Sequence, residues 1–439
     1  MPMSSNNRAA RGFTEGLQDD VDWFGDLTRR RSTGPVSPHH RTLSAEMSQE
    51  TLAVQAGTYE DPVTGAVGTP IFATTTFDLG SDSYSAFSDG ALRDVPIYTR
   101  YGNPSQWSVQ EKIASLEGAE SGLITSSGMA AVASTVFALT NEGGHIISAY
   151  DVYGGTYNFL REDISGSGRD VTFIDPLDLD AIQAAIRPET QMILLETLTN
   201  PLLKIPDIEA IGELAKRSNI LLVVDNTFLT PINCRPLRVG ADIVVHSATK
   251  YLSGHSDVTA GVVVGSRKYL DRIWAQALRF GGSAEAMTCY LVERGMKTLA
   301  LRVAQQNRSA GEISKYLNTH PAVLEVAYPT LHPETIPPFL REAPGFGGVV
   351  SFRASGGDRA ALAVMKRLEI PRTATSLGGV ESLVSMPTNT SHSSLTSGQK
   401  QLVGIQPGLV RLSIGIEGTT DILRDLEKAL ASEKEETDA

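Results

Sequence analysis

Short apolar segments alternate with helix-like segments over residues 105–300, and this alternation predicts an α/β fold. The helix-like segments include SVQEKIASLEGA, DLDAIQAAI and DIEAIGELAKRS, and Asp178 and Asp207 stand where helix N-caps are expected. Continuous Val/Ile/Leu runs are typical of strands covered on both faces, and the helices would supply the crossovers of a mainly parallel sheet. The candidate strands are GLIT, HIISA, VTFID, MILLE, ILLVVD, DIVVHS and AGVVVG.

The regions on either side of this alternation have different patterns. Residues 1–45 are polar and lack periodicity, which predicts a flexible tail because they cannot bury enough apolar surface to offset their ordering entropy. Residues 46–104 mix turn residues with short apolar pieces and predict an extended arm. Residues 301–439 contain helix-like stretches and strands such as VVSFR and LVRLSIGIE, which predict a smaller α+β domain.

Composition and charge exclude several classes of partner and site. The chain has 439 residues and a formal net charge of −12, so nucleic acid and anionic membranes would be repelled. No apolar run reaches the roughly 18 residues of a membrane span. Cys234 and Cys289 form no metal or disulfide pattern, which favours a cytoplasmic location. His246 and His255 have no third ligand nearby, so no metal site is expected.

Polar residues with complementary chemistry follow the predicted strands. ILLVVD ends in Asp225, and DIVVHS ends in Ser247, which is followed by Thr249 and Lys250. Ligands of open parallel sheets bind at the carboxyl ends of the strands. A lysine there can hold pyridoxal 5'-phosphate (PLP) as a Schiff base, while a carboxylate keeps the pyridine nitrogen protonated. The two hydroxyls and the glycine turn 126–130 before a helix start are suited to the phosphate.

Each signal has a simpler explanation when it is taken alone. A lysine after a strand is usually a solvated charge, a carboxylate there is often a helix cap, and Tyr153 in DVYGG is typical of a packing aromatic. Their common position at strand ends of one sheet favours the cofactor hypothesis. A nucleotide- or NAD-binding protein would need a glycine-rich or Walker motif after its first strand, and none is present. A catalytically silent protein of the same fold would have no need of Lys250, Asp225 and Arg411.

Eight segments, in order, resemble the cystathionine-type or Cys/Met-metabolism family of PLP enzymes, over roughly residues 50–435. SATKYLSGH with VVDNTF upstream is the most specific. The resemblance implies fold type I, as in aspartate aminotransferase: a large PLP-binding domain with a mainly parallel seven-stranded sheet, and a small C-terminal α+β domain. The segments are YTRYGNPS, SSGMAAV, DVYGGTYNF, ETLTNP, VVDNTF, HSATKYLSGHSDVTAG, SLGGVESL and LVRLSIGIE.

The resemblance also implies a role for individual residues. Lys250 would carry the Schiff base and shuttle protons, and Asp225 would pair with the pyridinium nitrogen. Tyr153 would stack on the ring and, as a further catalytic role, help deprotonate the incoming amino group. Arg411 would bind the substrate α-carboxylate, a task suited to a planar guanidinium. Residues expected to hold the phosphate, the cofactor or the carboxylate are Gly128, Met129, Ser247 and Thr249, with Asn200 and Ser376 beside them, and Tyr98 and Arg100 from a neighbouring subunit.

Four positions depart from the pattern of the relatives. Asn158 stands where cystathionine-handling relatives commonly carry arginine, and Thr375 stands where they often carry glutamate. Gly155 stands where methionine γ-lyases typically have cysteine, which disfavours that activity. Tyr101 stands where small residues are usual and would intrude on the partner's substrate cavity. These departures indicate a short or neutral γ-substituent, although neutral drift would leave the same pattern.

The expected function is therefore PLP-dependent γ-elimination or γ-replacement on a homoserine-derived or sulfur amino acid. The alternatives are cystathionine γ-lyase or γ-synthase proper, an O-acylhomoserine sulfhydrylase, and a specialised γ-lyase acting on a γ-halo or unsaturated amino acid. Because Tyr98 and Arg100 would act in a neighbouring subunit, the active unit is expected to be at least a dimer. The resemblance implies a homotetramer with active sites shared across each dimer, the arm 46–104 contacting the neighbour.

Overall fold

The computed structural model describes residues 39–44, 46–79, 84–85, 92–390, 393 and 396–431. The predicted tail, 1–45, lies mostly outside these described residues. Its described end packs on the arm, because His40 is buried, forms a β-bridge with Tyr59 and bonds the Pro104 carbonyl through Nε2 at 3.2 Å. The segment predicted as a tail therefore includes residues that contact the rest of the chain.

The large sheet has seven strands in the order β1-β7-β6-β5-β4-β2-β3, and each coincides with a predicted apolar segment. Only β7 runs antiparallel to its neighbours in this sheet, so the expected mainly parallel sheet is confirmed. The strands are β1 Ser121–Thr125, β2 His145–Ala149, β3 Asp170–Ile174, β4 Thr190–Glu196, β5 Leu221–Asp225, β6 Ile243–Ser247 and β7 Gly261–Gly265.

The inner strands of this sheet are almost completely buried. Ile147, Ile193, Val224 and Val244 are inaccessible to solvent, and they belong to β2, β4, β5 and β6. Burial on both faces explains why these strands are continuous apolar runs and not alternating patterns. Each such side chain stabilises the fold by roughly 1.5–3 kcal/mol.

Helices connect and cover the strands. Asp178 and Asp207 cap α7 and α8 as predicted, since their carboxylates accept hydrogen bonds from the amides of Ala181 and Ala210. The helices up to α11 are α2 Gln49–Gln55, α4 Pro104–Glu117, α5 Gly128–Leu139, α6 Gly154–Asn158, α7 Leu179–Ala185, α8 Ile208–Arg217, α9 Thr230–Asn233, α10 Arg267–Phe280 and α11 Ala286–Met296. A π-helical turn, Phe159–Ile164, continues α6.

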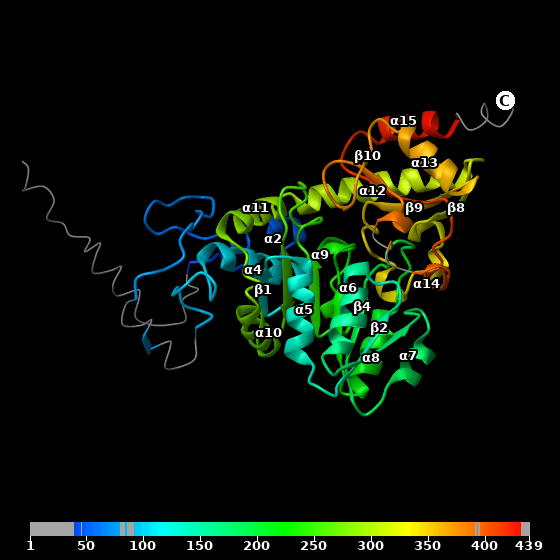
Figure 1. The fold of residues 1–439 in the computed structure, drawn as a ribbon. Helices are drawn as coiled ribbons and strands as arrows, with labels where there is room; N and C mark the ends of the chain where they lie inside the picture. The colour runs from blue at the N-terminus through cyan, green and yellow to red at the C-terminus, as the bar shows by residue number, and fades with distance from the viewer. Residues whose placement is uncertain are drawn as a thin grey trace, which may run out of the picture.

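The second sheet has five strands in the order β10-β11-β12-β9-β8 (Figure 1). Helices α12 and α13 pack on it, and α15 packs on these two helices. Its elements are β8 Val323–Ala327, β9 Val349–Ala354, β10 Arg372–Thr373, β11 Leu383–Ser385, β12 Leu409–Ser413, α12 Leu299–Thr319, α13 Gly357–Arg367, α14 Ser397–Val403 and α15 Thr419–Ala431. Short 3-10 helices occupy Pro236–Val239, Pro329–Leu331, Pro333–Thr335, Pro338–Leu340 and Pro387–Asn389.

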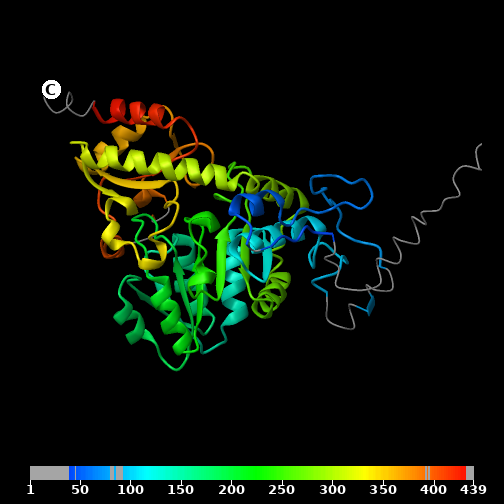
Figure 2. The same cartoon turned by 180° about the vertical axis from the view of Figure 1, so that it is seen from behind.

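The long helix α12 joins the two parts of the molecule (Figure 2). It packs on α2, which lies early in the described chain, and on β8 and β9 of the small sheet. The predicted domain boundary at residues 300–301 falls in the first turn of this helix. The arrangement thus fits a large and a small domain, while the residue-level boundaries stay predictions.

Candidate active site

A cavity of about 440 Å³ lies where the carboxyl ends of the large-sheet strands face the small sheet. Residues from both sheets line it, so it forms only when the two parts of the chain come together. The predicted site residues that line this cavity are Gly128, Met129, Tyr153, Asn200, Asp225, Ser247, Thr249, Lys250, Thr375, Ser376 and Arg411.

One end of the cavity is built to accept an anion. Helix α5 begins at Gly128, and its N-cap residue, Ser127, accepts a hydrogen bond from the Ala130 amide at 3.1 Å. A Cβ atom at position 128 would lie 3.0 Å from Cβ of Ser247, so glycine lets the end of β6 approach the helix start. Backbone amides at a helix N-terminus and a nearby hydroxyl favour a phosphate. Thr249, by contrast, already bonds both backbone groups of Ala260 through its hydroxyl.

Asp225 is held rigidly at the end of β5. Its Oδ1 accepts hydrogen bonds from the amide and the hydroxyl of Thr227, and that hydroxyl accepts one from the Ser247 amide at 2.8 Å. Burial raises the pKa of Asp225, and the bonds from Thr227 oppose this shift. A cationic ring nitrogen placed against this carboxylate would favour its charged form.

Lys250 lies in the turn after β6 and points at the small-sheet side of the cavity. Its Nζ donates a hydrogen bond to Oγ of Ser376 at 2.7 Å. Burial, and next the charge of Arg411, lower the pKa of Lys250 from 10.5 to about 8. About one tenth of the amine is therefore neutral at pH 7. The neutral amine is the nucleophilic form.

Arg411 enters the cavity from β12 and is buried. Its guanidinium donates to Oδ1 of Asn200 at 3.1 Å and to the carbonyl of Ser376 at 3.0 Å, while Nε has no hydrogen-bond partner among the described residues. Burial lowers its pKa to about 10, so it remains a cation at neutral pH. No described acidic side chain forms an ion pair with it. A ligand carboxylate would supply that missing charge.

Ser376 connects the lysine and the arginine. Its backbone has a φ of +84°, a conformation that non-glycine residues adopt at a penalty of roughly 1–3 kcal/mol. In this conformation its hydroxyl meets Lys250 while its carbonyl meets Arg411. The strained residue therefore sets the spacing between the amine and the guanidinium.

Tyr153 lies at the N-cap position of α6, after β2, with its side chain 47% exposed. Its ring passes over Gly155, since a Cβ atom there would lie 2.5 Å from Cε1 of Tyr153. A cysteine at position 155 would therefore displace the ring. The ring lines the cavity, which is the arrangement that stacking on a cofactor requires.

The described residues that line the cavity do not include Tyr98, Arg100, Tyr101 or Asn158. Asn158 ends α6 outside the lining. The other three lie in the arm, where the Arg100 guanidinium sits 5.6 Å from the ring centre of Tyr98 and 5.7 Å from that of Tyr101. Their predicted roles therefore require a second subunit.

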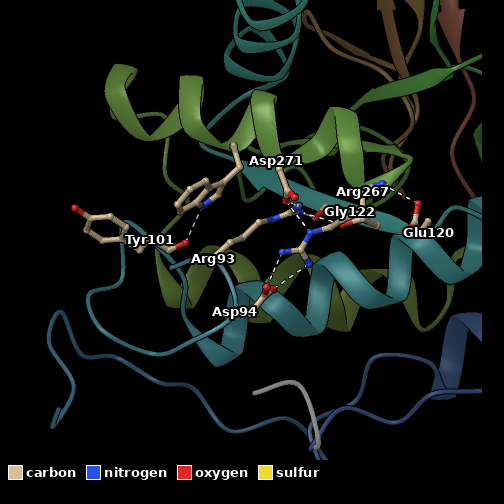
Figure 3. A network of polar contacts seen from close by, with 9 residues as sticks. Arg93, Asp94, Tyr101, Glu120, Gly122, Arg267 and Asp271 are labelled. Atoms are coloured by element: carbon tan, nitrogen blue, oxygen red, sulfur yellow. Dashed lines mark hydrogen bonds and ion pairs between the residues drawn. The ribbon is translucent and has the colours of Figure 1, made fainter. Parts of the chain in front are cut away.

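A charged cluster fastens this part of the arm to α10, as Figure 3 shows. Arg93 bonds Asp271 at 2.8 Å, and Arg267 holds Asp94 with two hydrogen bonds and Asp271 with a third contact. The indole of Trp274 donates to the carbonyl of Tyr101 at 2.9 Å (Figure 3). Segment 92–101 is thus fixed at both ends, although the side chains of Tyr98 and Arg100 are exposed.

Several lining residues were not predicted from the sequence. Glu196, at the end of β4, accepts the Tyr153 amide at 2.6 Å, and Thr227 orients Asp225. Both lie in segments already noted, ETLTNP and VVDNTF, and Glu196 ends an apolar strand just as Asp225 does. The remaining ones are Val132, Thr156, Phe228, Thr259, Leu377 and Thr390, while Ser127, which also lines the cavity, belongs to the turn 126–130 noted in the sequence.

The groups that line the cavity fit PLP. They offer an amine for its aldehyde, a carboxylate for its ring nitrogen and a helix start for its phosphate. Among the described residues, no cluster of three or more His, Cys, Asp or Glu could hold a metal ion. The described residues also contain no helix with the length and apolar character that a membrane span needs. Cys234 and Cys289 are both buried free thiols.

Comparisons with known proteins agree with this chemistry. The L-methionine gamma-lyase of Porphyromonas gingivalis is 38% identical over 87% of this chain and 96% of its own. The cystathionine gamma-lyase of Bacillus subtilis is 39% identical over 88% and 99%. The crystal structure of metB from Corynebacterium glutamicum matches with a TM-score of 0.83 at 36% identity, over 89% of this chain and all of that one. Residues 50–431 match the family model described as Cys/Met metabolism PLP-dependent enzyme, and the chain belongs to this family.

Proposed function

We propose that this PLP-dependent enzyme eliminates or replaces a short or neutral γ-substituent of an amino acid, with Lys250 moving the protons. Elimination and replacement at Cγ are the activities that its family relatives support. The observation that carries the proposed role of Lys250 is the hydrogen-bonded bridge from its amine through Ser376 to the Arg411 guanidinium. This bridge places a base and a carboxylate-binding cation on one wall of the cavity.

The chain's own residues would hold the cofactor at three points. Lys250 would bind it covalently through Nζ, Asp225 would pair with the ring nitrogen, and the start of α5 with Ser247 would hold the phosphate. Tyr153 would cover one face of the ring. When bound, PLP supplies an electron-withdrawing ring that stabilises negative charge at Cα of the substrate.

Proton transfer follows from the position of Lys250. A substrate carboxylate bound by Arg411 brings its Cα next to the Ser376 side of the cavity, where Nζ of Lys250 lies. An amine with a pKa of about 8 can accept a proton from Cα and release it again near neutral pH. Chemistry at Cγ needs a second proton to leave Cβ, and the same amine is the base on this wall.

The charge of the lining supports a neutral γ-substituent. The ionisable side chains among the described lining residues are Glu196, Asp225, Lys250 and Arg411. Glu196 lies beside Asp225, and the other three are assigned to the cofactor and the α-carboxylate. Thr375, where relatives often carry glutamate, contributes a neutral hydroxyl. One chain therefore offers no further charge for the distal ammonium and carboxylate of cystathionine, a group that would be costly to leave unpaired.

A substrate panel tests this proposal, because overall identity does not separate methionine γ-lyase from cystathionine γ-lyase relatives. Cystathionine, methionine, O-acetyl- and O-succinylhomoserine and a γ-halo amino acid would be compared by kcat/KM and product. The highest values are expected for the short, neutral substituents, with 2-oxobutanoate, a Cγ adduct or an unsaturated amino acid as product. Pyruvate as the only product would overturn the γ-position, and a preference for cystathionine would overturn the neutral pocket.

We also infer a homotetramer in which Tyr98 and Arg100 reach the phosphate of the neighbouring subunit. The exposed side chains on a firmly held arm segment support this arrangement. Tyr101 would then border the partner's substrate pocket. Sedimentation of the holoenzyme measures the assembly, and a monomer with full cofactor affinity would contradict it. The cytoplasmic location stays a prediction from the two cysteines.

A further inference from the structure

Glu196 is a buried carboxylate in the cavity wall that the mechanism above does not use. It ends β4 and stands in register with Asp225 at the end of the neighbouring strand β5. It lines the cavity, yet only 6% of the residue is exposed. Two carboxylates thus lie side by side on the wall that would face the cofactor ring.

The two oxygens of Glu196 have different surroundings. Oε1 accepts the amide of Tyr153 at 2.6 Å, whereas Oε2 is buried without a hydrogen-bond partner among the described residues. The bonded amide belongs to the N-cap residue of α6. Since the Tyr153 ring also rests on Gly155, this one bond and that one contact fix the direction of the ring.

Only one of the neighbouring carboxylates can be charged without a large penalty, because both are removed from water. Asp225 has two donors from Thr227 that stabilise its anion. Glu196 has one donor, and burial and then the charge of Asp225 raise its pKa well above the usual value. Of the two neighbouring carboxylates, Glu196 is therefore the one that holds a proton, and Asp225 is the one that is charged.

We propose that Glu196 is a positioning residue: a neutral carboxylic acid that holds the Tyr153 amide in place and leaves the negative charge of this wall on Asp225. The inference rests on the proposed function, in which Tyr153 covers the ring and Asp225 meets the ring nitrogen. It predicts that an uncharged side chain of the same shape can replace Glu196, while a truncated one cannot.

The test compares E196Q with E196A in the holoenzyme. Glutamine keeps an acceptor for the Tyr153 amide and carries no charge, so E196Q should retain kcat and cofactor affinity within about threefold of wild type. E196A removes the acceptor, and kcat should fall about tenfold or more, the size expected when a buried amide loses its partner. The visible circular dichroism of the bound cofactor should change in E196A and not in E196Q, because it reports how the ring is held.

D242A is the matched control. Asp242 also accepts a strand amide, that of Leu222 at 2.8 Å, but it lies at the opposite, amino-terminal ends of β5 and β6. It should lower thermal stability without changing the cofactor spectrum. Equal damage in E196Q and E196A would overturn the neutral carboxylic acid, and a wild-type spectrum and rate in E196A would overturn the positioning role. If wild type bound no cofactor, the proposed function itself would fail, which is a different outcome.

Discussion

Two regions hold their functional side chains in opposite ways: the cavity wall formed by Lys250, Ser376 and Arg411, and arm segment 92–101. In the wall, Lys250, Ser376 and Arg411 form a hydrogen-bonded chain, and Arg411 is almost fully buried. On the arm, the side chains of Tyr98 and Arg100 are exposed. Ion pairs and the Trp274 indole fasten the backbone of this segment to α10.

This difference separates what one chain can do from what needs a neighbour. Buried hydrogen bonds to charged groups contribute about 1.5–3 kcal/mol each, so the wall is organised within a single chain. Each ion pair of the arm has at least one partly exposed partner. Such pairs contribute about 0.2–1 kcal/mol, enough to restrain a segment but not to build a pocket. Segment 92–101 is therefore a firmly held carrier of Tyr98 and Arg100, which are not among the described residues that line the cavity.

The largest effect is expected when the Lys250 amine is removed from the cavity wall. K250A removes the base and the covalent attachment, so kcat/KM should fall by at least about 10²–10⁴-fold, the usual contribution of positioned proton transfer. Steady-state kinetics on the best substrate of the panel measures this loss. K216A, at an exposed position of helix α8, serves as control. More than a tenth of the activity surviving in K250A would rule out its role.

Next in size is the effect of the wall's guanidinium. R411K keeps a positive charge but loses the two-pronged geometry that matches a carboxylate, so KM should rise about 10- to 100-fold, equivalent to about 1.5–3 kcal/mol. R187K, in a more exposed ion pair with Asp170, should leave KM unchanged. An unchanged KM in R411K would place the substrate carboxylate elsewhere.

The protonation of Lys250 gives a smaller effect that needs no mutation. Its pKa is lowered to about 8, so the competent neutral amine accumulates as the pH rises through that value. Uptake of PLP by cofactor-free protein should accelerate about tenfold between pH 7 and pH 9 and then level off, following the neutral fraction. Stopped-flow absorbance measures the rate, and a rate that falls with pH over this interval would refute the assignment.

The arm gives the smallest effect. D94A and R267A loosen segment 92–101, so the dissociation constant for PLP should rise by up to about fivefold while the assembly state stays the same. R100A should have the larger effect, because it removes the group itself. D170A, which breaks the exposed Arg187 pair, is the matched control. A change of thermal stability in D94A without any change in cofactor affinity would confine the cluster to a structural role.

Much of the large sheet was predictable because its strands are buried on both faces. All seven appear as short Val/Ile/Leu-rich runs, and Asp178 and Asp207 mark helix starts by local hydrogen bonds. The antiparallel direction of β7 was not predictable, since AGVVVG has the same pattern in either direction. Strands β10 and β11 are too short to give any periodicity.

The candidate site was only partly predictable, for a physical reason. Asp225 stands out because it ends an apolar run, and Lys250 because it comes three residues after the end of another. Glu196 follows one too, yet a carboxylate at that place is commonly structural, and only its register with Asp225 gives it meaning. The bond from Lys250 to Ser376 joins residues 126 positions apart, a contact that local patterns do not encode.

Reduction of the holoenzyme with borohydride, followed by peptide mapping, shows which lysine carries the cofactor. We expect one pyridoxyl group per chain, on Nζ of Lys250. We expect none on Lys204, which forms an ion pair with buried Asp151, two residues before Tyr153. A pyridoxyl group on another lysine, or reduction that fixes none, would contradict it.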